Sequence, residues 1–182
     1  MKKAIGMAEF ITVSEGIAAA DRMVKTAEVE ILEAQTVCPG KYIVVISGEL
    51  SAVNAAVDAA KKHHADKLID SFVLGNPHES IFPAIYASAE ITGAEALGVM
   101  ETFSAASAVF AADAAAKTAL VDLIELRLAR GMCGKSYLML TGTVSAVAAA
   151  IERANAAAAE RGLFLDSKVI PKPDNKLWKT IL

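Results

Sequence analysis

The chain of 182 residues contains the same sequence pattern twice, and this duplication limits the folds open to it. Ala19-Ala20-Asp21 recurs as Ala111-Ala112-Asp113, and Ser51-Ala52-Val53 recurs as Ser145-Ala146-Val147. Solenoid proteins repeat every 20 to 50 residues, roughly, whereas this unit takes up about half of the chain. Two copies of a unit this long indicate two similar domains, which we place at residues 1–90 and 91–182.

Each copy has the pattern of a strand, a helix, two strands, a helix and a strand. Continuous apolar runs predict the strands, and apolar residues at helical spacing predict the helices. This order is the split βαβ plan of a ferredoxin-like fold, so the predicted class is α/β, an α+β sandwich in each of two tandem domains. The elements expected in the first copy are a strand Ala4–Phe10, a helix Ser14–Thr26 with Ser14 as its N-cap, strands Val29–Val37 and Lys41–Ser47, an alanine-rich helix ending near His64, and a strand Leu68–Leu74.

The composition favours an assembling protein over an isolated monomer. Hydrophobic residues make up 54% of the chain, charged residues only 21%, and 37 residues are alanine. Because so little charge covers the surface, we expect extensive contacts between closely packed subunits. A net charge of −3 without a basic run disfavours nucleic acid and anionic membranes as partners. No apolar run is as long as a membrane-spanning helix, which needs about 20 residues. We expect the chain to act in the cytoplasm.

Several segments together resemble the shell domain of bacterial microcompartments. The run Ala4–Glu9 resembles the first strand of that family, Ala19–Ala27 resembles its first helix, and Val169–Pro173 resembles its last strand and turn. Two copies over about residues 4–181 make the chain similar to the tandem-domain shell proteins, which form pseudohexameric trimers. The resemblance implies a homotrimer that lies in the microcompartment shell beside other shell proteins and is not an enzyme.

The segment Val37–Lys41 narrows the resemblance to shell proteins of the PduT type, in which a cysteine of the central loop holds an iron–sulfur cluster at the pore. By this resemblance Cys38 of three chains would hold one [4Fe–4S] cluster, while Pro39 stiffens the loop and Gly40 permits close approach of the backbone. A cubane cluster has three-fold axes, so three thiolates around one axis leave the fourth iron open. The implied role is electron transfer or cluster delivery across the shell, with an encapsulated or cytosolic redox protein as partner.

The second copy places a cysteine one position away from the aligned Cys38. Met132, Cys133 and Gly134 fall in its central loop, so we expect them, with Cys38, to line the pore. Cys133 has two further interpretations, as a second ring of thiols or as an alternate ligand. Lys25 and Lys117 match the edge lysine of the family and are expected to contact neighbouring tiles, the alternative being two solvated helix lysines.

Three alternative functions are considered beside the iron–sulfur cluster. Zinc held by three thiolates is an inorganic alternative, because soft thiolates bind zinc as well as iron–sulfur clusters. A metal-free shell protein with a gated pore for metabolites is a second alternative. A nucleophilic Cys38 thiolate would make the chain an enzyme, but no histidine is placed to activate it. His63-His64 has the pattern of a solvated helix end.

Overall fold

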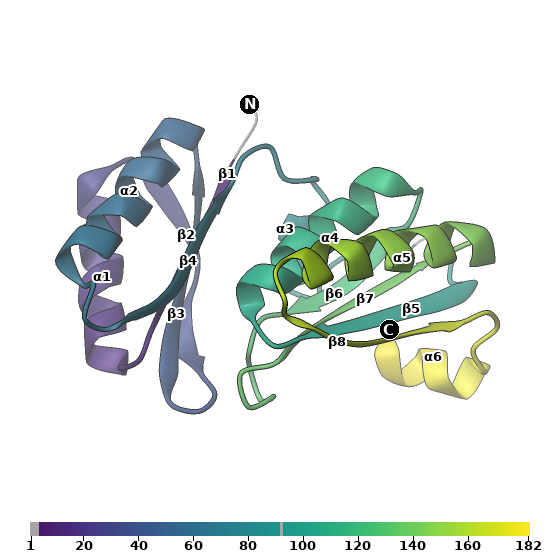
Figure 1. The fold of residues 1–182 in the computed structure, drawn as a ribbon. Helices are drawn as coiled ribbons and strands as arrows, with labels where there is room; N and C mark the ends of the chain where they lie inside the picture. Colours follow the sequence, from purple (N-terminus) through teal and green to yellow (C-terminus); the bar gives the residue numbers. More distant parts are fainter. Residues whose placement is uncertain (1–3, 92) are drawn as a thin grey trace. The chain divides into compact units, whose positions relative to one another are not determined.

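Each half of the chain forms a four-stranded antiparallel sheet with two long helices packed against it (Figure 1). The computed structural model describes residues 4–91 and 93–182, and these separate into two compact units that divide between Pro77 and His78. Within those described ranges, no helix has the length and apolar character that crossing a membrane requires.

The first unit has the strand order β2-β3-β1-β4, the ferredoxin-like arrangement that the sequence predicts. Strand β1 therefore lies between β3 and β4, and all seven of its residues are buried. The elements are β1 (Ala4–Phe10), α1 (Val13–Thr26), β2 (Val29–Val37), β3 (Lys41–Gly48), α2 (Leu50–His63) and β4 (Leu68–Leu74).

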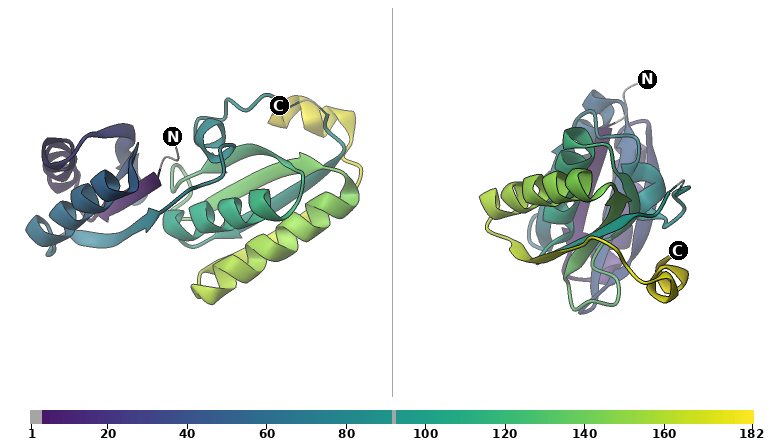
Figure 2. Two further views of the ribbon diagram at one scale, coloured as in Figure 1. Left: turned by 90° about the horizontal axis from the view of Figure 1, so that it is seen from above. Right: turned by 90° about the vertical axis from the view of Figure 1, so that its right-hand side faces the viewer.

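The second unit repeats this topology with the strand order β6-β7-β5-β8. Figure 2 shows its two long helices, α4 and α5, side by side on the sheet. The repeated elements are β5 (Ala96–Thr102), α4 (Ala105–Thr118), β6 (Asp122–Arg127), β7 (Ser136–Gly142), α5 (Val144–Glu160) and β8 (Phe164–Ile170).

Two short helices, α3 (Ile81–Ile85) and α6 (Asn175–Ile181), lie outside the predicted six-element plan. Helix α3 packs against β6 and α4. Trp178 of α6 packs in a cluster with Ile124 and with Val99, a residue of β5 whose neighbour Gly98 faces α5. Because successive strand residues point to opposite faces, α6 covers the sheet face that α4 and α5 leave open (Figures 1 and 2).

Two glycines let the second helix of each unit approach the central strand. An added Cβ on Gly6 of β1 would lie 2.6 Å from Val53 and 2.8 Å from Val57, both on α2. An added Cβ on Gly98, the equivalent residue of β5, would lie 2.8 Å from Ile151 on α5. Since packed side chains do not come this close, the two units share a helix–sheet contact that depends on glycine.

The prediction that Ser14 caps the first helix is wrong. Helix α1 begins at Val13, and Thr12 occupies the N-cap position without a side-chain hydrogen bond. The backbone of Thr12 is extended, with φ of −129°, so the helix starts directly after it and Ser14 falls in the first turn. In the second unit the equivalent Ser104 is a true cap, because its Oγ accepts a hydrogen bond from the backbone N–H of Ser107 at 3.1 Å.

The compact units divide between Pro77 and His78, whereas the sequence repeat places the domain boundary at residue 90. The difference has a packing origin. The backbone N–H of His78 donates to Asp113 Oδ1 at 2.8 Å, and Ile91 packs in the cluster around Trp178. The connecting segment 78–91 therefore associates with the second unit.

Candidate functional site

The β2–β3 hairpin carries the first cysteine at its tip. Val37 and Lys41 form the last cross-strand pair, so Cys38, Pro39 and Gly40 are the three residues of the loop, as the sequence predicts for this turn. The backbone N–H of Gly40 donates to the carbonyl of Val37 at 2.9 Å and closes the loop. Gly40 has φ of +92°, a left-handed conformation that favours glycine.

The Cys38 thiol is free and partly exposed. Within residues 4–91 and 93–182, no three or more His, Cys, Asp or Glu side chains of one chain gather closely enough to hold a metal ion. The described residues of one chain therefore do not complete a site for a cluster or a zinc ion at Cys38. A single soft sulfur donor on a tight loop fits a site shared between chains, because iron–sulfur clusters and zinc both select thiolates.

An ion pair ties the far end of this loop to the centre of the sheet. Lys41 Nζ lies 2.6 Å from Glu9 Oε1, and the side chains of Lys41 and Glu9 are 23% and 6% exposed. Glu9 belongs to β1, where it pairs in register with Ile43 on one side and with Asp70 on the other. Sequence reasoning missed this pair because its residues are 32 positions apart in the chain.

The equivalent loop of the second unit is longer and more irregular. It runs over the eight residues 128–135 between β6 and β7. Cys133 is exposed and free, and its φ of +52° is unusual for a residue other than glycine; Ala129, Gly131 and Gly134 also have positive φ. Met132 and Gly134 are partly exposed beside Cys133, so the structure brings these three together at one loop tip. That they line a pore stays a prediction.

A charged cluster supports the base of this second loop. Glu125 accepts hydrogen bonds from Arg127 Nε at 2.7 Å and from the Tyr137 hydroxyl at 2.5 Å. Burial, and next the hydrogen bond to Glu125, raise the pKa of Tyr137 to about 12. The hydrogen bond to Glu125 also raises the pKa of Arg127. The alternation of Glu125, Arg127 and Tyr137 on paired strands was the only signal in the sequence for this cluster.

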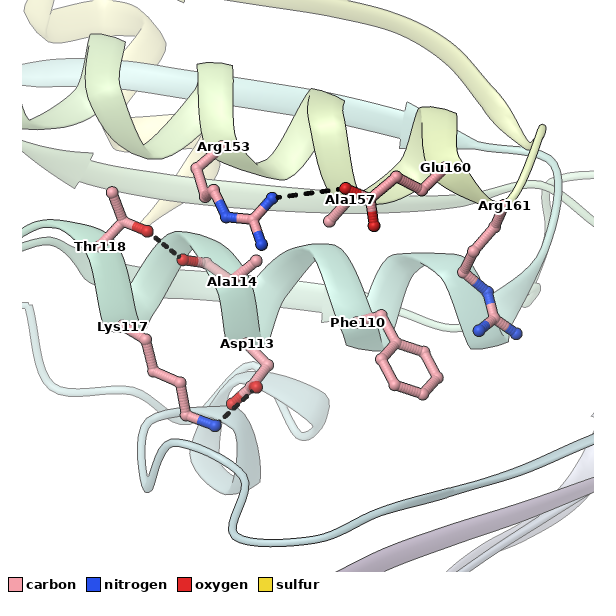
Figure 3. Close-up of a pocket in the computed structure, with 9 residues that line it drawn as sticks. All are labelled: Phe110, Asp113, Ala114, Lys117, Thr118, Arg153, Ala157, Glu160 and Arg161. Atoms are coloured by element: carbon pink, nitrogen blue, oxygen red, sulfur yellow. Dashed lines mark hydrogen bonds and ion pairs between the residues drawn. The ribbon is translucent and has the colours of Figure 1, made fainter.

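The two edge lysines lie in matching places at the last turns of α1 and α4. Lys25 Nζ is 2.6 Å from Asp21 Oδ2, and Lys117 Nζ is 2.7 Å from Asp113 Oδ2. Each pair borders a hollow, of about 430 Å³ beside α1 and His64 in the first unit and of about 450 Å³ between α4 and α5 in the second. Figure 3 shows the second hollow, which is lined by Phe110, Asp113, Ala114, Lys117, Thr118, Arg153, Ala157, Glu160 and Arg161. The tile contacts of both lysines remain predicted.

The sequence predicts that His64 lies on a solvated helix end, and this prediction is wrong. Its side chain is buried, its Nδ1 lies 2.6 Å from Glu15 Oε1, and its ring meets Phe10 edge-on at 6.1 Å between centroids. His63, in contrast, is exposed. The interpretation fails for His64 because its partner on α1 is 49 positions away, beyond any local pattern.

Both units and the whole chain are similar to known shell proteins. The BMC-domain family matches residues 4–77 and again residues 96–173. The chain is 37% identical over 182 residues to the bacterial microcompartment shell protein PduT of Citrobacter freundii, covering 100% of this chain and 99% of that protein. It is 45% identical to a microcompartment protein of Desulfitobacterium hafniense of known crystal structure. The two structures superpose with a TM-score of 0.94 over 98% of this chain and 99% of the other. It is also 38% identical to the carboxysome shell protein CsoS1 of Prochlorococcus marinus over 85 residues, which are 45% of this chain and 82% of that protein.

Proposed function

The chain belongs to the BMC-domain family of bacterial microcompartment shell proteins, and on this premise we propose that three chains form a ring of six domains whose centre binds a [4Fe–4S] cluster through Cys38. The structural role in the shell follows from the family. The ring is supported by two units of the same topology within one chain, which gives a trimer the six equivalent domains of a hexamer.

One observation supports the cluster most directly. Cys38 is a free thiol at the tip of a three-residue loop, and the described residues of one chain form no group of three or more His, Cys, Asp or Glu side chains that could hold a metal ion. Three-fold symmetry brings three identical thiols around one axis, and three thiolates match three corners of a cubane. The second unit does not repeat this loop, so each chain contributes one such ligand.

The residues of the chain have separate tasks in this proposal. The Cys38 sulfur binds iron, Gly40 allows the backbone to turn, and Pro39 limits the motion of the loop. The longer loop with Met132, Cys133 and Gly134 lines the opening from the alternate domains. When bound, a [4Fe–4S] cluster supplies one-electron chemistry, accepting an electron from a reduced carrier and passing it to an oxidised one. The function is then passage of electrons, or delivery of the cluster itself, across the shell.

Metal analysis of protein purified without oxygen tests the proposal. We expect four iron and four sulfide per trimer, a brown colour with broad visible absorption, and loss of both in Cys38→Ser while the trimer persists. Cys133→Ser is the matched control and is expected to keep the cluster. Full iron and sulfide in Cys38→Ser would overturn the ligand assignment.

The same measurement separates the two alternatives. One zinc per trimer without sulfide identifies a structural zinc site. Absence of any metal after anaerobic preparation and reconstitution identifies a metal-free shell protein with a gated metabolite pore. The irregular 128–135 loop is the observation that favours this second candidate, because it lies outside the helices and strands and four of its residues adopt positive φ.

A further inference from the structure

We infer that Lys41, held by Glu9, is a positioning residue that fixes the Cys38 loop for metal binding, an inference that rests on the proposed function. Two residues flank the loop. Val37, which precedes it, is 4% exposed and belongs to the buried hydrophobic residues. Lys41, which follows it and lies three residues after Cys38, is held by the ion pair to Glu9 at 2.6 Å.

The anchor point is rigid. Glu9 lies on β1, which is hydrogen-bonded to β3 on one side and to β4 on the other, so its backbone has no free edge. Its carboxylate is nearly excluded from solvent and lies across from Asp70, a second acid on the neighbouring strand. Removal of the Lys41 ammonium alone would leave the buried Glu9 carboxylate without this cation, which is strongly destabilising.

The second unit shows what a loop looks like without a tight anchor. There the equivalent lysine, Lys135, lies 3.5 Å from Glu101, with side chains 40% and 33% exposed. Its loop has eight residues and several positive φ values. The tight pair thus coincides with the short loop that carries the proposed ligand. Residues that orient metal ligands typically change metal affinity by about 10- to 100-fold when removed.

The test compares two double variants of the full-length trimer. Glu9→Met/Lys41→Met replaces both charges by unbranched apolar side chains, so no buried charge is stranded and folding is preserved. Glu101→Met/Lys135→Met makes the matched change in the second unit. After anaerobic reconstitution with ferrous iron and sulfide, we expect the first variant to lose iron to a chelator about 10-fold faster or more, and the second to match the wild type.

Two further measurements separate positioning from stability. In metal-free protein, hydrogen exchange at the amides of Gly40 and Lys41 should be faster in Glu9→Met/Lys41→Met than in the wild type, and unchanged in Glu101→Met/Lys135→Met. The separate variant Lys41→Arg keeps the ion pair and should lose iron as slowly as the wild type. Wild-type rates of iron loss in Glu9→Met/Lys41→Met would overturn the inference. If the wild type binds no iron, the proposed function fails instead, and the exchange rates still decide whether the ion pair holds the loop.

Discussion

The β2–β3 loop and the β6–β7 loop occupy the same place in two copies of one fold, yet they differ in length, backbone and anchoring. The first has three residues, a half-buried cysteine and a flanking lysine tied to Glu9 at 2.6 Å. The second has eight residues, an exposed cysteine and an ion pair at 3.5 Å. Duplication lets one copy keep a rigid loop suited to a ligand while the other acquires a longer loop.

The difference extends to the residues at the start of the strands that follow the loops. Tyr42 of β3 packs against Gly16, where an added Cβ would lie 2.4 Å from the Tyr42 ring. The repeat places Ser136 and Ala108 at the same two positions of the second unit. There the small Ser136 accepts a hydrogen bond from the backbone N–H of Ala129 at 3.0 Å and ties the long loop to β7. Aromatic packing supports the short loop, and a polar contact supports the long one.

Removal of the lysine from each ion pair is expected to give the largest difference in stability between the two units. Lys41→Ala strands the buried Glu9 carboxylate, which we expect to reduce the free energy of unfolding by about 3 kcal/mol. Lys135→Ala removes a longer, partly exposed pair and should cost at most about 1 kcal/mol. Guanidinium denaturation of both variants, with hydrogen exchange to locate the loss in one unit, gives the measurement. Equal losses in the two variants would show that the two anchors are equivalent.

The next effect tests the exchange of aromatic for polar support. Gly16→Ala forces a Cβ against Tyr42, so we expect a loss of about 2 kcal/mol despite the better helix propensity of alanine. Gly16→Ala/Tyr42→Ser reproduces the pair of the second unit and should recover part of this loss. A double-mutant cycle on the denaturation midpoints measures the coupling. Additive effects of the two substitutions would contradict the packing argument.

The sequence was sufficient for the duplication, the element order and the loop positions, because apolar periodicity and turn residues act locally. The strands Ala4–Phe10, Val29–Val37 and Leu68–Leu74 appear with the predicted bounds. The contacts that distinguish the two copies were not predictable. The pairs of Glu9 with Lys41 and of Glu15 with His64 join residues 32 and 49 positions apart, so they exist only once the sheet and helices have packed.

A smaller expected effect is the pH dependence of stability that Tyr137 gives to the second unit. The pKa of Tyr137 is raised to about 12 in the folded protein, from the ordinary value near 10. The unfolded chain therefore releases this proton first, so the stabilisation from Tyr137 is complete below about pH 10 and is lost as the pH rises towards 12. Tyr137→Phe should lose about 1 kcal/mol at neutral pH and show a flatter decline above pH 10. Denaturation series from pH 8 to about 11.5 measure both slopes; an unchanged slope would contradict the assignment to Tyr137.

The smallest effect on folding concerns the edge lysines, where the two units again differ. The Lys25 side chain is 72% exposed beside an exposed Asp21, whereas Lys117 is 40% exposed and its partner Asp113 also accepts the backbone N–H of His78. Lys25→Ala should change the free energy of unfolding by about 0.3 kcal/mol and Lys117→Ala by slightly more. If both lysines contact neighbouring tiles, each variant keeps its trimer but fails to form sheets, which sedimentation and electron microscopy distinguish. Normal sheets from Lys25→Ala/Lys117→Ala would show that both are ordinary solvated lysines, and the resemblance between the two hollows would then reflect shared ancestry of the helices alone.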